Sequence, residues 1–275
     1  MRIGIVGTEN SHVDHVIDHL NTERGHDGAR VVAVSGGPSE RNEALRAKGD
    51  LERIVDEPGD LLDLVDAVVV ADRHGGLHRA HALPFLEAGL PVFVDKPLAC
   101  TVSDAEALVA AARANNAALT SYSALRWLPD TDALAAVAGP DLVTASGPAD
   151  PASPHGGVFF YGIHPVDVAL RLARGAVGEV EVTRLTDGVI ARAAVGDATV
   201  RIELAFPRDG VDPPFRGSVR ADGRTTERAL TLDRHYFVPG LELFLAMVET
   251  GRPPVEYDDL LRPVRLLHAI AEAVD

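Results

Sequence analysis

The residue best suited to chemistry in this sequence is Lys96, which follows the apolar run at residues 92–94 and precedes a proline. Of the 26 cationic residues, 24 are arginines and two are lysines, Lys48 and Lys96. An ammonium group in a partly dry site can have its pKa lowered until it exchanges protons near neutrality. The alternative is that Lys96 pairs with Asp95 or another surface carboxylate, and the residues alone leave both interpretations open.

The loop at residues 7–12, GTENSH, is a candidate for binding phosphate. A glycine at a strand end, followed by a helix with free N–H groups, is typical of dinucleotide-binding folds. The fingerprint G-x-G-x-x-G is not met, because Glu9 and His12 occupy the second and third glycine positions, and a Glu9 carboxylate would lie unfavourably close to phosphate. Asn10 or Ser11 can cap the helix. The loop therefore either binds a nucleotide or merely starts a helix.

The end of the second predicted strand bears on the choice of cofactor. An acidic residue there usually holds the adenosine ribose of NAD, but the sequence reads VSGG with no carboxylate until Glu40. Ser35 and Arg41 could instead receive the 2′-phosphate, which favours NADP slightly over NAD. The alternative is that Arg41 is a solvated residue on the next helix.

Three histidines at helical spacing, His12, His15 and His19, resemble a metal-binding face together with Asp14 and Asp18. Three ligands on one helix seldom converge on one ion, because the first and third lie two turns apart. We therefore expect a polar helix edge and no metal. A metal-dependent hydrolase remains the least favoured hypothesis.

These residues need a scaffold, and the first 122 residues alternate short apolar runs with helical periods. Uniformly apolar runs are typical of strands that are buried on both faces. Ser103 and Glu106 form a capping box before a helix. Strand and helix in repetition predict a Rossmann-like, doubly wound parallel sheet in the α/β class. The predicted strands lie at 3–6, 31–34, 67–71, 92–94 and 117–119.

The pattern changes after residue 122. Residues 199–206 alternate polar and apolar side chains, which predicts an antiparallel strand with one solvated face. Asp187-Gly188, Gly196-Asp197 and Asp222-Gly223 predict hairpin turns. We therefore expect a dinucleotide-binding domain at 1–122, then at 123–275 an α+β domain with a largely antiparallel open sheet, for substrate binding and oligomerisation. The segment at 147–157 is expected to be a loop.

Two motifs now point to a family. Asp95-Lys96-Pro97 differs by one methylene from a Glu-Lys-Pro motif, and a G-x-H-x-x-D pattern runs from Gly162 through His164 to Asp167. With His78 before an alanine-rich helix, these features make the chain resemble the Gfo/Idh/MocA family, the relatives of glucose-fructose oxidoreductase and inositol dehydrogenase.

The resemblance implies an NAD(P)-dependent dehydrogenase of sugars, polyols or related alcohols, with Lys96 and His164 at the reaction centre. His164 would accept or relay the hydroxyl proton and Lys96 would hold the developing alkoxide. We expect His164 at a helix start, where the dipole favours a neutral imidazole. Phe160 stands where the family often has an aspartate, and Asp72-Arg73 replaces a common Thr-Pro. The alternative is therefore a cofactor- or metabolite-binding relative without redox turnover.

The expected site combines both lines of reasoning. The predicted cofactor-binding residues are Gly7, Thr8, Glu9, Asn10, His12, Ser35, Arg41, Asp72, Arg73, His78, Asp95, Lys96 and Pro97. The predicted substrate-binding residues are Arg126, Tyr161 and Asp167, and the predicted catalytic pair is Lys96 and His164.

Composition sets the remaining expectations. A formal charge of −15 argues against nucleic acid as a partner. The sequence has neither a signal-peptide pattern nor an apolar run of membrane-spanning length, and a single cysteine, Cys100, allows no internal disulfide. We therefore expect a cytoplasmic protein with a small-molecule substrate and no membrane contact. A homodimer or homotetramer would fit the family.

Overall fold

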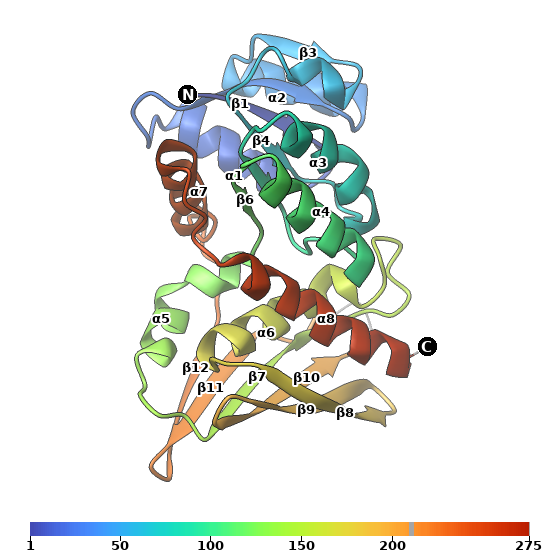
Figure 1. The fold of residues 1–275 in the computed structure, drawn as a ribbon, viewed down its shortest axis with the longest axis vertical. Coiled ribbons are helices and arrows are strands. Elements are labelled where there is room, and N and C mark those ends of the chain that lie inside the picture. The colour runs from blue at the N-terminus through green and yellow to red at the C-terminus, as the bar shows by residue number, and fades with distance from the viewer. Residues whose placement is uncertain (209–211, 275) are drawn as a thin grey trace. The chain divides into compact units, whose positions relative to one another are not determined.

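The computed structural model describes residues 1–208 and 212–274 (Figure 1). These residues form two compact units. The first comprises Met1–Tyr122 and Phe237–Leu260. The second comprises the described residues of 123–236 and 261–274. Helix α8 (Tyr257–Val274) runs through the boundary at residue 260.

A six-stranded sheet in the order β3-β2-β1-β4-β5-β6 forms the centre of the first unit, and all of its strand pairs are parallel. This order is that of a Rossmann fold. The central strands are apolar on both faces because helices cover both, and Ile5 and Phe93 are fully buried. The strands are β1 (Arg2–Val6), β2 (Arg30–Ser35), β3 (Arg53–Val55), β4 (Ala67–Val70), β5 (Val92–Val94) and β6 (Leu119–Thr120).

The helical segments between β1 and β6 connect successive strands of the parallel sheet, and α7 is contributed by a later part of the chain. Thr101, and not Ser103 as the sequence suggested, caps α4, because its side chain accepts the N–H of Asp104 at 3.1 Å. The helix therefore begins one residue before Ser103. The helical segments are α1 (His12–Ile17), the π-helix η1 (Asp18–Thr22), α2 (Ser39–Gly49), η2 (Pro58–Leu61), η3 (Gly75–Leu77), α3 (His78–Glu87), α4 (Val102–Ala114) and α7 (Val238–Thr250).

The second unit contains a six-stranded sheet in the order β12-β11-β7-β10-β9-β8. Only β7 and β10 pair in parallel, and the other neighbours are antiparallel. Helices α5 and α6 pack on this sheet. Its elements are η4 (Ala124–Trp127), α5 (Pro129–Ala135), β7 (Leu142–Pro148), α6 (Phe159–Leu172), β8 (Val177–Leu185), β9 (Gly188–Val195), β10 (Ala198–Ala205), β11 (Arg216–Ala221) and β12 (Arg224–Ala229).

The predicted α/β fold class, with a parallel sheet followed by a mostly antiparallel one, is confirmed. Asp222 and Gly223 both have positive φ between β11 and β12, as a tight hairpin turn requires. Gly188 instead begins β9, so that hairpin turns at residues 186 and 187. The loop predicted at 147–157 begins two residues later in the structure, because Gly147 and Pro148 still belong to β7 and pair with β10.

One segment differs from the expected domain organisation. The second domain is predicted to span 123–275, whereas Phe237–Leu260 belongs to the first compact unit. The physical reason is aromatic packing, because Phe244 lies 5.7 Å from Phe93 on β5, centroid to centroid, and Phe237 lies 4.8 Å from His12.

No helix in the described ranges is long and apolar enough to cross a membrane.

Candidate active site

The first loop of the parallel sheet is tight at Gly7. Its φ is +81°, and a Cβ there would lie 2.6 Å from the backbone nitrogen of Asp72, so that only glycine fits. The N–H of Gly7 donates to the carbonyl of Ser35 at 2.9 Å. The ends of β1, β2 and β4 therefore converge around one glycine, at the edge where ligands bind in such sheets.

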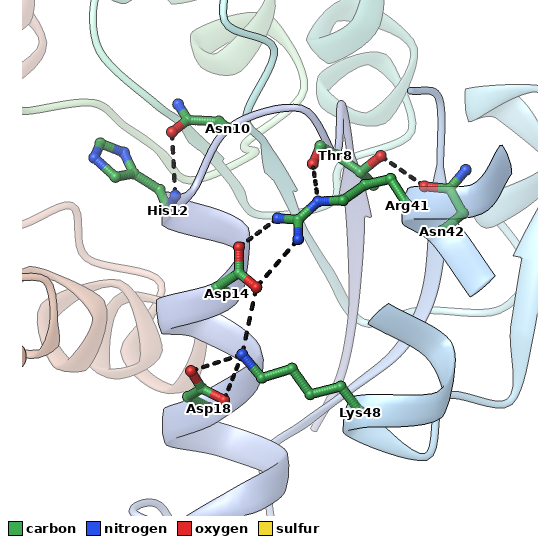
Figure 2. Close-up of polar contacts among 8 residues, drawn as sticks. All are labelled: Thr8, Asn10, His12, Asp14, Asp18, Arg41, Asn42 and Lys48. Atoms are coloured by element: carbon green, nitrogen blue, oxygen red, sulfur yellow. Dashed lines mark hydrogen bonds and ion pairs between the residues drawn. The ribbon is translucent and has the colours of Figure 1, made fainter. Parts of the chain in front are cut away.

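The two residues that break the glycine fingerprint do not crowd this loop. Glu9, expected to place a carboxylate unfavourably close to a bound phosphate, has an exposed side chain. His12 is buried, and its Nδ1 lies 2.7 Å from Oδ2 of Asp95. Asn10 donates to the same oxygen at 2.7 Å. Its own Oδ1 accepts the N–H of His12 at 3.1 Å (Figure 2). Asn10 thus ties the β1 loop to Asp95, whereas Ser11, the residue before α1, makes no capping hydrogen bond through its side chain.

Thr8 joins this loop to the next. Its hydroxyl lies 3.0 Å from the carbonyl oxygen of Gly36. The same hydroxyl lies 2.6 Å from Oδ1 of Asn42 (Figure 2). The hydroxyl of Ser35, at the end of β2, is buried and makes no hydrogen bond to any described residue. A buried hydroxyl without a partner is costly, so this atom fits a role in holding a ligand.

The loop after β4 is held to the loop after β5 by His78. This fully buried ring lies 2.9 Å from the carbonyl oxygen of Asp72 through Nε2, and 2.7 Å from that of Pro97 through Nδ1. The Asp72 carboxylate lies 2.8 Å from Nδ1 of His81 and raises the pKa of that imidazole. His78 therefore supports the turn that carries Lys96, and the Lys96-Pro97 bond in that turn is cis.

Lys96 lies in this turn with its side chain almost completely buried. Burial lowers the pKa of its ammonium group, the Asp95 carboxylate opposes this, and the Arg73 guanidinium lowers it further. Burial also acts against the charge on Asp95, but His12 and Lys96 outweigh it and hold the pKa of that carboxyl below its ordinary value. A buried lysine whose pKa is lowered can exchange protons closer to neutral pH than a solvated one.

In the second unit, His164 lies on α6 and is buried. It is not at the helix start, as the sequence analysis expected, because α6 begins at Phe159 and Pro165 is accommodated inside the helix. The helix dipole therefore cannot act on His164 in the predicted way, since that effect falls off within the first turn. The hydroxyl of Ser123 lies 2.6 Å from Nδ1 of His164 instead.

The three predicted substrate-binding residues also lie around α6. Arg126 donates to Asp167 at 2.7 Å in a buried ion pair, and the other oxygen of Asp167 accepts the N–H of Ser123 at 2.8 Å. The Tyr161 ring lies 6.1 Å from that of His164, centroid to centroid. Asp167 thus positions the segment that bears Ser123, which in turn contacts His164.

The structure groups the predicted residues within each unit. The loops of the first unit gather the predicted cofactor-binding residues, and α6 with the preceding segment gathers His164, Tyr161, Asp167 and Arg126. Ser123 and Asn42 were not predicted from the sequence. The one signal for Ser123 was that a serine before a short helical segment often caps it, and its hydroxyl accepts the N–H of Leu125 at 3.1 Å.

No group of three or more histidine, cysteine, aspartate or glutamate side chains within 1–208 and 212–274 is arranged to hold a metal ion. His12 is directed to Asp95, and His19 lies 2.7 Å from Glu242 on α7. His12 and His19 are therefore engaged with carboxylates from two different segments.

The loops suit a dinucleotide. The close backbone approach at Gly7 and the buried Ser35 hydroxyl lie at the ends of β1 and β2, where a Rossmann fold holds the pyrophosphate and the adenosine ribose. Together with the strand order, they define the first unit as a Rossmann-type dinucleotide-binding domain.

Comparison with known proteins indicates which family of dinucleotide-binding proteins the chain resembles. Residues 1–123 match the model of an oxidoreductase family with an NAD-binding Rossmann fold, Gfo/Idh/MocA. The chain is similar to inositol 2-dehydrogenase 1 of Saccharopolyspora erythraea, with 42% identity over 40% of this chain and 32% of the relative. It is also similar to inositol 2-dehydrogenase of Rhodococcus erythropolis, with 32% identity over 67% of this chain and 52% of the relative. The matches thus span about a third to a half of these relatives.

The fold of the whole chain is similar to the crystal structure of a Gfo/Idh/MocA family oxidoreductase from Vibrio cholerae. The TM-score is 0.78 with 17% identity, and the match covers 100% of this chain and 98% of that one. Residues 1–123, which carry the sequence match, are thus similar to the NAD-binding domain of the Gfo/Idh/MocA oxidoreductase family, and the whole chain is similar in fold to the solved structure.

Proposed function

We propose that the protein is an NAD(P)-dependent dehydrogenase that oxidises a secondary alcohol of a polyol, sugar or similar small molecule, or reduces the corresponding ketone. The observation that carries this proposal is Lys96, a buried lysine of lowered pKa in the turn after β5. The names of the inositol dehydrogenase relatives support a polyol substrate.

The nicotinamide, when bound, would accept the hydride from the carbinol carbon. The hydroxyl oxygen of the substrate must also lose its proton, and we assign this proton to His164 as base or relay. The Lys96 ammonium stabilises the alkoxide that develops on the same oxygen. Ser123 orients the His164 ring through the bond to Nδ1.

The residues that would hold the dinucleotide come from the segments that follow β1 and β4 and from the end of β2. Gly7, Thr8 and Asn10 would form the pyrophosphate loop, Ser35 would contact the adenosine ribose, and Asp72, Arg73 and His78 would lie toward the nicotinamide. The proposed substrate contacts are Arg126, Tyr161 and Asp167. The last of these acts from within an ion pair with Arg126.

We also propose self-association into a homodimer or homotetramer through the second sheet. Most residues of β8 are exposed, among them Leu185 with 47% of its surface accessible. Its three valines are half-buried, and an edge strand with unpaired backbone groups can pair with a second copy of the chain. Light scattering after size-exclusion chromatography would give the mass of the particle, and a monomer would contradict this part of the proposal.

The proposal is tested by following NADH and NADPH absorbance at 340 nm while a panel of polyols, aldoses and their ketones is offered. Binding of each cofactor is measured in parallel by thermal unfolding, because a ligand of the native state raises the midpoint. Turnover with at least one polyol or sugar is the expected result. Saturable cofactor binding without turnover on the whole panel would overturn the dehydrogenase assignment in favour of a non-redox binding protein.

A further inference from the structure

Arg41 is bound on two sides by this chain's own groups (Figure 2). Its Nε donates to the backbone carbonyl of Thr8 at 3.0 Å. Its two terminal nitrogens both contact the carboxylate of Asp14, one at 3.2 Å and the other at a shorter distance. This fork-to-carboxylate geometry is the same that an arginine uses to bind a phosphate. The Asp14 carboxylate therefore occupies the face of Arg41 that an anionic ligand would need.

The neighbouring charges are balanced as well. Nζ of Lys48 lies 3.3 Å from Asp14 and 2.8 Å from Asp18 (Figure 2). Two cations, Arg41 and Lys48, thus face two carboxylates on α1 and η1. Burial raises the pKa of Asp14, but Arg41 and Lys48 outweigh this and lower it below its ordinary value, so the carboxylate is charged at neutral pH.

This cluster lies where a Rossmann fold distinguishes its cofactors. Arg41 is in the first turn of α2, directly after the β2 loop of Ser35 and Gly36. The adenosine ribose lies at this strand end, where an acidic residue binds its hydroxyl and an arginine accommodates the 2′-phosphate of NADP. In this chain the strand end has no acidic residue, and the arginine beside it is held by Asp14.

We propose that Asp14 is a specificity-determining residue that positions Arg41 against α1 and so makes the protein prefer NAD to NADP. This rests on the proposed function, because it concerns the cofactor of the same site. A 2′-phosphate would meet two cations whose charges are already balanced by two carboxylates. It would also compete with Asp14 for the guanidinium of Arg41. Asp14 acts through Arg41, so its removal should release the arginine for the phosphate.

Calorimetric titration of the purified protein with NAD and with NADP tests this without any substrate. We expect NADP to bind at least about tenfold more weakly than NAD, as the loss of one charge-assisted contact implies. In the Asp14→Asn variant, NADP binding should strengthen about tenfold while NAD binding changes less than about twofold. Adding Arg41→Met to Asp14→Asn should abolish that gain.

The matched control is Asp18→Asn, which removes the same charge nearby but leaves the contact between Arg41 and Asp14 in place. It should not alter the ratio of the two affinities. Equal gains of NADP affinity in both single variants would overturn the inference in favour of a general charge effect, as would wild-type protein that binds NADP as tightly as NAD. If wild-type protein binds neither dinucleotide, the proposed function itself fails, and this inference with it.

Discussion

The hydroxyl of Ser123 lies 2.6 Å from Nδ1 of His164, and both residues are buried. Ser123 itself is fixed, because its N–H donates to Asp167 and its hydroxyl caps the short helix at Leu125. The contact is therefore a rigid support for the imidazole that we assign to proton transfer. It supplies His164 with a polar partner from outside α6.

Replacing Ser123 by alanine should lower kcat about tenfold to a hundredfold, because the His164 ring loses the bond that orients it. The pH profile of kcat/KM should shift as well, since the hydrogen bond to the ring is lost. Ser123→Thr keeps a hydroxyl and should retain most of the activity. Equal activity of the alanine variant and the wild type would contradict the positioning role.

The backbone at Gly7 should tolerate no side chain. Gly7→Ala combines a strained φ of +81° with a contact of 2.6 Å to the Asp72 backbone, and should cost about 3 kcal/mol or more of unfolding free energy. Gly28 is the matched control, because it has the same φ of +81° but no atom within 4 Å of its Cβ position. Gly28→Ala should cost about 1 kcal/mol. Chemical denaturation of both variants measures the difference.

A small pH dependence of stability should come from His81. The Asp72 carboxylate raises the pKa of this histidine in the folded state, chiefly through a hydrogen bond, while burial opposes it. A raised folded pKa gives a contribution that is complete below the unfolded value of about 6.5 and is lost as the pH rises through the folded value. At pH 5.5 the wild type should therefore be more stable than His81→Gln by up to about 1 kcal/mol of unfolding free energy. At pH 8.5 this difference in stability should be smaller. A difference that grows toward alkaline pH would contradict this.

Much of the fold was predictable, because buried parallel strands leave uniformly apolar runs in the sequence. The five predicted strands of the first unit correspond to β1, β2, β4, β5 and β6. The missed strand, β3, is a three-residue edge strand with half-buried residues, Arg53–Val55, and so carries no such signal. The assignment of Phe237–Leu260 was not predictable, because local periodicity shows that a helix has an apolar face and not which unit covers it.

The sequence predicted which loops form the candidate site, but it did not predict which side chains contact one another there. Strand ends pointed to Gly7, Ser35 and Lys96, because ligands bind at the carboxyl edge of a parallel sheet. That Asp14 binds Arg41, 27 residues away, or that Ser123 reaches His164, 41 residues away, depends on tertiary packing. Spacing along the chain instead suggested a metal face that included His12 and Asp14, whereas the fold gives each of them a different partner.

The most direct test of the account is Lys96→Met, assayed with the polyol or sugar that the wild type turns over. The near-isosteric side chain fills the same buried space without an ammonium group. We expect turnover to fall by about a hundredfold or more, with NAD binding and the thermal unfolding midpoint close to wild type. Turnover that is unchanged in a folded, NAD-binding Lys96→Met protein would contradict the assignment of Lys96 to the reaction.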